Sequence, residues 1–279
     1  MAAPDRDGGG PDDVVVRAPA KLTRRLRIVG RRPDGYHLLA AEMVTVDLYD
    51  ELQFSSGDSL DVVDDVDWLT PPDGRVPAAS SPGGALDGPN LVQLALAAVG
   101  RSASVRLTKR IPAGAGLGGG SADAAAVMRW AGNSDVGVAV GLGADVPFCL
   151  GGGCALVSGI GEVIEPLAHQ PADVLLVVPP VHVSTLTVFA AWDALGGPAG
   201  ELENDLEPAA LVAEPRLAWW RDLISEVSGR RPHLAGSGGT WWLDGDAVAL
   251  ADVQQAVSAA IAGAGKSALV KLVKTVPAS

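Results

Sequence analysis

Two parts of the sequence carry residue types that could do chemistry. Residues 109–130 read KRIPAGAGLGGGSADAAAVMRW, with five glycines in seven positions ahead of an apolar run. Asp145 is the single charged residue within positions 136–161. Glycine leaves the backbone bare and free to bend, so the first segment has room for a bulky anion. A carboxylate in a neutral, apolar stretch is costly unless it has a purpose, which makes Asp145 a candidate for catalysis, with a helix cap as the plain alternative.

Three kinds of structure compete for the glycine-rich segment. A tight turn that packs a helix on a sheet needs one or two glycines, and five exceed that need. Gly114, Gly116 and Gly119 match G-x-G-x-x-G, but a dinucleotide site needs an acid about 20 residues on, and Asp135 falls in a turn-like stretch. A glycine loop that opens a helix instead offers N–H groups and a positive dipole end to a phosphate. Ser121 at the helix entrance is then either an N-cap or a ligand of Mg²⁺ or phosphate.

Composition bounds the class of protein. The chain has 279 residues, 48% of them hydrophobic, enough for one large domain or two ordinary ones. A formal net charge of -12 argues against a general nucleic-acid binder. The two cysteines, Cys149 and Cys154, provide no disulfide framework and favour a reducing cytoplasm. Residues 136–161 are long enough to cross a membrane, but eight glycines and a proline favour a buried part of a soluble core.

The apolar pattern predicts an α+β protein, because strands and helices mix without strict alternation. We expect a disordered tail over 1–13, a first domain over 14–165 and a second over 166–279, with a long loop at 70–89. The predicted strands cover 13–30, 38–54, 58–69, 102–112, 172–180 and 267–276. The predicted helices cover 90–100, a run starting near 121, 215–229 and 245–265.

Five segments occur in an order that resembles one family. PAGAGLGGGSADAA is similar to the central motif of the GHMP kinases. APAKLT…GRRPDGYHLL, GADVPFCLGGGCALVSGIGE, ENDLE and LAGSGGT resemble the members that phosphorylate 4-diphosphocytidyl-2-C-methyl-D-erythritol in non-mevalonate isoprenoid biosynthesis. The match runs from about residue 16 to 245. It implies the GHMP kinase fold, with an N-terminal ribosomal protein S5 domain 2-like part and a C-terminal ferredoxin-like α/β sandwich. It also implies an ATP-dependent transferase acting on the 2-hydroxyl.

The resemblance assigns the catalytic and nucleotide-binding residues. It makes Lys21 an active-site lysine paired with Asp145, whereas most of the neighbouring arginines read as a solvated strand face. It places adenine near Asn90, which by itself reads as an N-cap. Mg²⁺ is expected to be held chiefly by phosphates and water, without a protein metal cluster, Ser121 apart. The ATP phosphates are expected over Pro112, Ala113, Gly114, Ala115, Gly116, Leu117, Gly118, Gly119, Gly120, Ser121 and Ala122.

The resemblance also points to the acceptor side. Tyr36 and His37 become cytidine-binding residues, although they also read as a loop edge. Asn204 and Asp205 are placed near the substrate, although they also read as helix caps. A second glycine loop with Gly236, Ser237 and Gly238 is expected beside the first, or as a plain hairpin turn. Thr23 stands where the family usually has Asn and is counted among the substrate-binding residues.

Some features depart from the family pattern. Arg24 replaces an apolar strand residue and needs a carboxylate partner if it faces the core. Residues 121–145 leave little room for the usual second helix. The alternatives are therefore a GHMP-type kinase of another small alcohol, a weakly catalytic nucleotide-binding relative, or a dinucleotide oxidoreductase. We expect a cytoplasmic monomer or homodimer with a small-molecule substrate, binding neither nucleic acid nor membrane.

Overall fold

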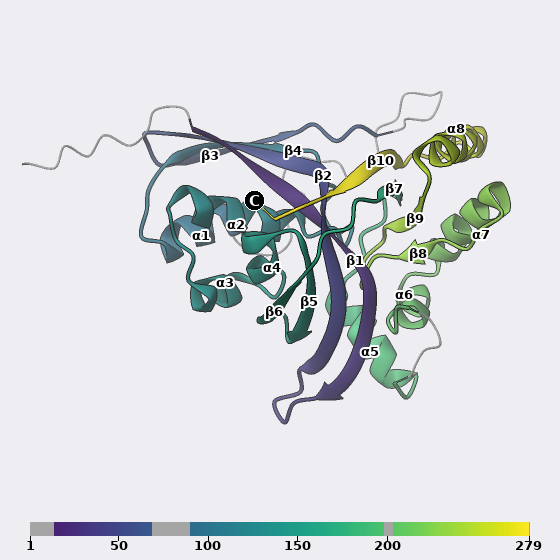
Figure 1. The fold of residues 1–279 in the computed structure, drawn as a ribbon, viewed down its shortest axis with the longest axis horizontal. Coiled ribbons are helices and arrows are strands. Elements are labelled where there is room, and N and C mark those ends of the chain that lie inside the picture. The colour runs from purple at the N-terminus through teal and green to yellow at the C-terminus, as the bar shows by residue number, and fades with distance from the viewer. Residues whose placement is uncertain (1–13, 69–89, 198–202, 279) are drawn as a thin grey trace, which may run out of the picture.

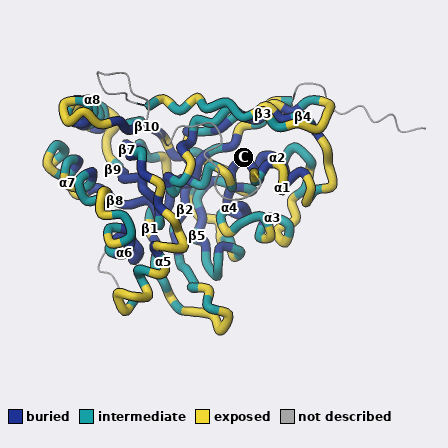
Figure 2. The backbone as a smooth tube through the Cα atoms, turned by 180° about the vertical axis from the view of Figure 1, so that it is seen from behind, coloured by how far each residue is buried: buried dark blue, intermediate teal, exposed yellow. Residues whose placement is uncertain are grey.

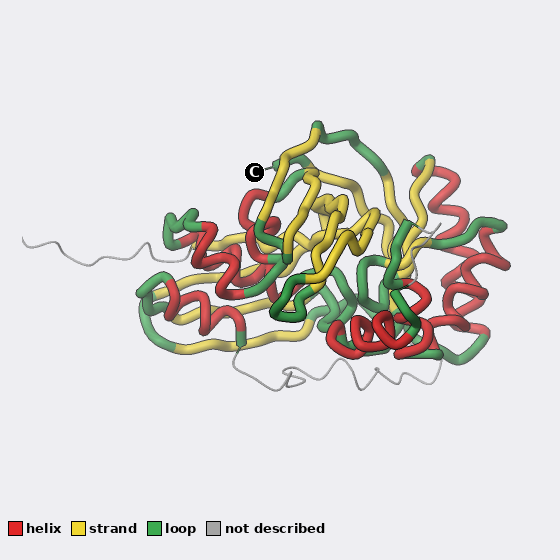
Figure 3. Tube along the Cα trace, turned by 90° about the horizontal axis from the view of Figure 1, so that it is seen from below, coloured by secondary structure: helices red, strands yellow, loops and turns green. Residues whose placement is uncertain are grey.

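A computed structural model describes residues 14–68, 90–197 and 203–278. The predicted tail lies outside these residues, and so does the predicted loop at 70–89. The described chain forms a mixed α/β structure with strands through its centre and helices gathered in two groups (Figures 1 and 3).

A long antiparallel hairpin organises the N-terminal half. Strand β1 (Val14–Arg31) pairs along its length with β2 (His37–Ser55). The turn between them carries Pro33, Asp34 and Gly35, and the amide of Arg32 donates to the Tyr36 carbonyl at 2.7 Å. Both strands confirm the predictions made from alternation. The exposed tip of the hairpin extends away from the buried centre of the molecule (Figure 2).

One sheet connects the two halves of the chain. Its strand order is β3-β4-β2-β10-β7-β9-β8 among the described residues, with β1 and β5 also paired to β2, and β6 paired to β5. Strand β10 pairs with both β2 and β7, so the last strand of the chain joins the first half to the second. The remaining strands are β3 (Ser59–Asp64), β4 (Ser104–Lys109), β5 (Cys154–Gly159), β6 (Val163–Leu167), β7 (Asp173–Val178), β8 (His233–Leu234), β9 (Trp241–Gly245) and β10 (Leu269–Val276).

In the described residues four helices pack with the N-terminal strands, and α2 is the central one. Its alanines let it approach its neighbours closely, so that Ala122 to Met128 are all buried. This core is built from small aliphatic residues, with Phe54 stacked on Trp130 at 4.5 Å between ring centroids. The four helices are α1 (Leu91–Ala98), α2 (Gly119–Trp130), α3 (Val136–Leu142) and α4 (Val146–Gly151).

The described part of the C-terminal half contains four more helices. Helix α5 lies beside the hairpin, while α6, α7 and α8 flank β7, β8 and β9 (Figure 1). The predicted helices at 215–229 and 245–265 are confirmed as α7 and α8. Helices α5 and α6 were not predicted as elements, because both are short and their apolar residues are not spaced along one face. These helices are α5 (Thr185–Ala194), α6 (Glu207–Ala213), α7 (Arg216–Ser228) and α8 (Ala247–Gly263).

The neutral segment at 136–161 folds into short elements. It forms α3, α4 and β5, and no helix in the described part of the chain is long and apolar enough to span a membrane. Residues 121–145, where little room was expected for the usual second helix, hold only the short α3, and the Asp135 side chain caps it by accepting from Gly137 and Val138. The division into domains at 165 and 166 stays a prediction, and β6 spans that point.

Candidate functional site

Lys21 and Asp145 form an ion pair between β1 and the start of α4. Lys21 Nζ lies 3.2 Å from Asp145 Oδ2 and also donates to Thr23 Oγ1 at 3.2 Å. The pairing of β1 with β2 shifts register between Pro19 and Lys21 and again after Thr23. Irregular pairing of this kind changes the direction of side chains. The two shifts lie on either side of the part of β1 that carries Lys21 and Thr23.

Asp145 occupies the N-cap position of α4 but does not act as a cap. Its carboxylate accepts no capping hydrogen bond from the described backbone, and Pro147 in the first turn removes one N–H donor. The helix-cap alternative is therefore wrong. The Asp145 side chain is 31% exposed and that of Lys21 only 7%. The ammonium is held in place, while the carboxylate keeps a face open to a ligand.

The first glycine loop, residues 114–120, lies directly against Lys21. The amide of Lys21 donates to the Leu117 carbonyl at 3.0 Å. A Cβ at Gly118 would lie 2.7 Å from Cγ of Lys21, so a side chain at this position would displace the lysine. Gly114, Gly116 and Gly118 all have positive φ, a conformation that favours glycine.

Helix α2 begins at the end of this loop, at Gly119, with Gly118 as its N-cap. Ser121 lies inside the first turn, so the N-cap alternative for Ser121 was wrong, while the helix predicted to start near 121 is confirmed as α2. A three-turn helix with its first amides next to a side-chain-free loop is the arrangement that binds a phosphate. Ser121 lies close to this helix end, and its contact with Mg²⁺ or phosphate stays a prediction.

The second glycine loop, residues 236–239, packs on the first. A Cβ at Gly116 would lie 2.7 Å from Cα of Gly238 and 2.8 Å from the Ala235 carbonyl oxygen. The Ala115 carbonyl accepts from the Thr240 hydroxyl at 2.7 Å, which ties the two segments together. The second loop also connects the antiparallel strands β8 and β9. It is therefore a hairpin turn and, at the same time, the neighbour of the first glycine loop.

The Asn204 side chain holds the backbone at the start of the second glycine loop. Its side-chain amide donates to the carbonyls of Leu234 and Gly236 at 2.9 and 2.7 Å, and its oxygen accepts from the Leu206 amide. Gly236 in turn lies beside Thr23, since a Cβ added at Gly236 would lie 3.4 Å from the Thr23 hydroxyl oxygen. Asn204 therefore acts through backbone that faces Lys21 and Thr23.

Asp205 ties the same segment to β1. Its carboxylate accepts from the Arg27 guanidinium at 2.8 Å and from the Ile28 amide at 2.9 Å, and its side chain is buried. Neither bond caps α6, because both donors lie on β1. The substrate contacts predicted for Asn204 and Asp205 stay predictions.

The side chains of Tyr36 and His37, at the start of β2, have different surroundings. Tyr36 is 61% exposed, beside the Arg32 guanidinium. His37 turns toward α5, where its Nε2 lies 2.8 Å from Asp193 Oδ1 and its ring stacks on Phe189. Ser237 also reaches α5, through a 3.0 Å hydroxyl contact with Thr185. Asn90 acts as the predicted N-cap of α1, accepting from the Val92 amide at 2.9 Å.

A buried cluster behind the first glycine loop was missed by the sequence reasoning. Lys109 Nζ bonds the carboxylates of both Asp50 and Asp123. A Cβ at Gly119 would lie 3.2 Å from Lys109 Nζ, so the cluster sits under the start of α2. Burial raises the pKa of Asp123 to about 7, and the Lys109 ammonium opposes the rise. Burial lowers the pKa of Lys109, but the two carboxylates raise it by more. An acid within the alanine run SADAAAVM was the available signal.

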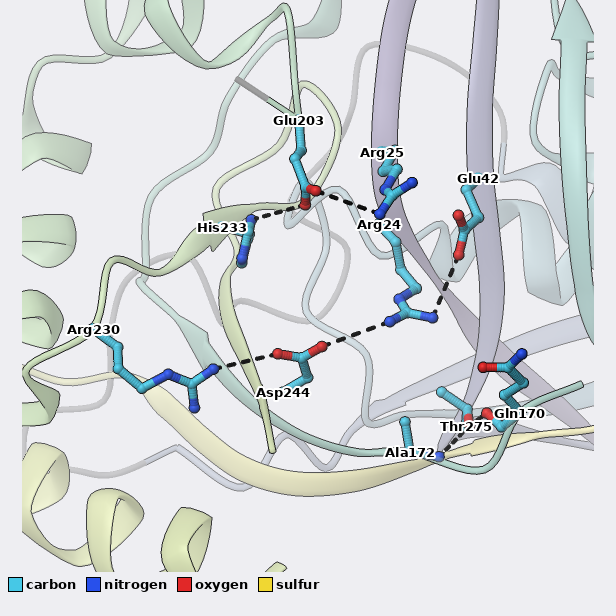
Figure 4. Close-up of polar contacts among 10 residues, drawn as sticks. All are labelled: Arg24, Arg25, Glu42, Gln170, Ala172, Glu203, Arg230, His233, Asp244 and Thr275. Atoms are coloured by element: carbon cyan, nitrogen blue, oxygen red, sulfur yellow. Dashed lines mark hydrogen bonds and ion pairs between the residues drawn. The ribbon is translucent and has the colours of Figure 1, made fainter. Parts of the chain in front are cut away.

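Arg24 has the carboxylate partners that its position requires. Its guanidinium lies 3.4 Å from Glu42 on β2 and 3.6 Å from Asp244 on β9, and Asp244 also pairs with Arg230. Figure 4 shows this chain of ion pairs crossing from the hairpin to the C-terminal half. A partner was expected if Arg24 faced the core; its side chain is only partly buried but pairs with two carboxylates, and the arginine links the two halves.

Thiol chemistry is disfavoured in the site. Cys149 in α4 is buried, and its burial raises the pKa of the thiol to about 12, far above the range of a reactive thiolate. Cys154 is partly exposed, with its pKa raised by desolvation. A cavity of about 490 Å³ elsewhere is lined by neither glycine loop and by neither Lys21 nor Asp145; its lining includes Asp64, Asp65, Trp68, Arg110 and Lys271.

Comparison with known proteins agrees with this arrangement. Residues 90–153 match the family model of the GHMP kinases N terminal domain. The chain is 34% identical over 262 residues to 4-diphosphocytidyl-2-C-methyl-D-erythritol kinase of Paramagnetospirillum magneticum, which covers 81% of this chain and 86% of the relative. It is 36% identical to the enzyme of that name from Paracoccus denitrificans, with 88% and 91% covered. The chain belongs to the 4-diphosphocytidyl-2-C-methyl-D-erythritol kinase family.

Solved structures place this family member within the GHMP kinase fold. A crystal structure of 4-(cytidine 5'-diphospho)-2C-methyl-D-erythritol kinase superposes with a TM-score of 0.65 at 27% identity, covering 95% of this chain and 100% of that one. A mevalonate kinase structure, at 11% identity and a TM-score of 0.53, shares the fold alone. The predicted GHMP kinase fold is confirmed.

Proposed function

We propose that this chain transfers the γ-phosphoryl group of ATP to the 2-hydroxyl of 4-diphosphocytidyl-2-C-methyl-D-erythritol. The observation that carries the proposal is the Lys21–Asp145 ion pair held against the first glycine loop. It brings a carboxylate with an open face, an ammonium and an anion-binding backbone together in one place. Phosphoryl transfer relies mostly on such positioning and charge stabilisation.

Each group has a role in this reaction. The first glycine loop and the amides at the start of α2 bind the phosphates. Asp145 accepts a hydrogen bond from the acceptor hydroxyl and takes up its proton as the oxygen attacks phosphorus in line. Lys21 keeps Asp145 oriented and faces the negative charge that develops on the transferred group. Thr23 accepts a second bond from the lysine ammonium and helps to hold it.

Mg²⁺ would enter with the triphosphate. Among the described residues no group of three His, Cys, Asp or Glu side chains could hold a metal ion. Phosphate oxygens and water are therefore its main ligands in the proposal, and the Ser121 hydroxyl in the first turn of α2 is the candidate protein ligand. The ion supplies charge neutralisation between the phosphates.

The acceptor side of the proposal rests on Tyr36 and His37 beside α5. An exposed phenol ring offers a face for stacking on a pyrimidine, and an imidazole can bond a base edge. We place adenine near Asn90. We also propose a cytoplasmic setting, in keeping with the two free cysteines. The formal net charge of -12 favours a small molecule rather than nucleic acid as the partner.

The test is a product assay with the purified protein. ATP, Mg²⁺ and the cytidylylated substrate should give ADP and a 2-phosphate. Both products can be detected by ³¹P NMR. Tyr36→Ala should raise the KM of the cytidylylated substrate much more than that of a small polyol offered as acceptor. Equal use of a polyol by the wild type would favour a kinase of another alcohol. ATP binding without turnover would indicate a nucleotide-binding relative, and tighter binding of NAD(P) than of ATP would overturn the proposal.

A further inference from the structure

One face of α5 forms a seat for the His37 ring. His37 stacks on Phe189 with ring centroids 4.9 Å apart and meets Trp192 edge-on at 5.3 Å. Its Nε2 lies 2.8 Å from Asp193 Oδ1. Trp192 and Asp193 follow Phe189 by three and four positions, the spacing that places side chains on the same side of a helix as Phe189. The His37 side chain is only 9% exposed, so this seat fixes its plane.

Asp193 stands at a position that a carboxylate ordinarily avoids. It lies in the last turn of α5, where the helix dipole disfavours negative charge. Its described partners come from the hairpin: His37, and Arg31 at 3.6 Å. The contact therefore joins α5 to the beginning of β2, next to Tyr36.

The contact decides which ring nitrogen of His37 carries the proton. An ionised carboxylate can only accept hydrogen bonds, so Nε2 must be the donor to Asp193. In the neutral imidazole Nδ1 is then unprotonated and acts as an acceptor. Nδ1 has no hydrogen-bond partner among the residues that the structure describes.

We propose that Asp193 is a positioning residue that selects the base of the acceptor. It holds His37 as the Nε2–H tautomer, so that Nδ1 accepts an N–H bond from the exocyclic amine of an aminopyrimidine. A uracil in the same place presents a carbonyl oxygen, which leaves two acceptors facing each other, and buried unpaired groups of this kind give strong discrimination. The inference rests on the proposed function and names the group that would set its base preference.

The first test reads the tautomer directly, without turnover. Long-range ¹H–¹⁵N NMR of the full chain at pH 8.5, where imidazoles are ordinarily neutral, should show His37 with a protonated Nε2 and an unprotonated Nδ1. Asp193→Asn keeps the size of the side chain but can donate as well as accept, so the His37 signals should shift toward a mixture. A wild-type His37 protonated on Nδ1 would overturn the proposal.

The second test measures base choice. Wild type should prefer the cytidylylated substrate over its uridine analogue in kcat/KM by about 100-fold. Asp193→Asn and Asp193→Ala should raise the KM of the cytidine substrate about tenfold and narrow that preference. The KM of ATP should stay within about twofold of the wild-type value in both variants.

Arg31→Gln is the control: it removes the other partner of Asp193, together with an exposed Arg31 bond to the Gly35 carbonyl, and leaves the His37 contact. It should behave as wild type in both tests. The same loss of base preference in Arg31→Gln, or an unchanged preference in both Asp193 variants, would contradict the role of Asp193. If wild type makes no product from the cytidylylated substrate, the proposed function fails, while the NMR result still decides the Asp193–His37 contact.

Discussion

Lys21 Nζ and Asp145 Oδ2 lie 3.2 Å apart, one on the first strand and the other at the start of a helix in the middle of the chain. Exposed ion pairs contribute little, because both partners are solvated and mobile. Here the lysine is buried and also bonded to Thr23, so the flexible partner is already fixed. The pair is built to present a carboxylate rather than to add stability.

Asp145→Asn should lower kcat about 10²- to 10⁴-fold, because the amide cannot take the proton of the acceptor hydroxyl. The KM of ATP should change less than about threefold, since the glycine loops are untouched. Steady-state kinetics with a coupled ADP assay measures both. Asp135→Asn is the matched control: Asp135 caps the neighbouring α3, and Asn caps equally well. Turnover by Asp145→Asn at the wild-type rate would remove Asp145 from the mechanism.

Gly116→Ala should abolish ATP binding and destabilise the fold by several kcal/mol, more than backbone strain alone. Its Cβ would lie 2.7 Å from the second glycine loop. Gly132→Ala provides the comparison, because Gly132 also has positive φ but nothing within 4 Å of its Cβ. It should cost about 1 kcal/mol and keep activity. Urea unfolding and ATP titration separate the two, and equal losses would mean that the loops do not touch.

Asp123 should make stability depend on pH. Its folded pKa of about 7 lies above the ordinary value, so the folded state holds a proton that the unfolded state has released. This contribution is complete below about pH 4 and is lost as pH rises to about 7. The raised pKa of Lys109 acts only above this range.

Asp123→Asn removes the titrating group and should remove this part of the dependence. Urea unfolding at pH 5 and pH 8 measures it: the stability of wild type relative to the variant should fall as pH rises. A difference between the two proteins that is the same at both pH values would show that Asp123 is already ionised at pH 5.

Asn204→Asp should destabilise the protein by about 2–4 kcal/mol, because the carboxylate cannot donate to the two carbonyls that the amide now serves. The second glycine loop should loosen, which lowers activity as well. Asn133→Asp is the control, since Asn133 only accepts, from the Asp135 amide, at an exposed turn. Thermal unfolding and initial rates measure the effect, and a stable, active Asn204→Asp would show that the loop needs no support from this side chain.

Several features were predictable because the interactions that produce them are local. Alternating apolar residues predicted β1 and β2, and Asn90 ahead of an apolar run predicted the cap of α1. Positive-φ turns require glycine, so both glycine loops were visible as composition. The cap of α2 was misassigned to Ser121, because Gly118 is a poor sequence signal for a cap.

The fold class, the glycine loops and the family could be predicted without coordinates, since strand alternation and turn chemistry depend on residues that are neighbours in the chain. Tertiary structure alone decided the contacts of Asp193 with His37, of Asp205 with Arg27 and of Lys109 with Asp50 and Asp123. These partners lie on different elements, and an ion pair or ring stack leaves no periodic trace in the chain. Only the packing of the strands and helices brings such groups within bonding distance.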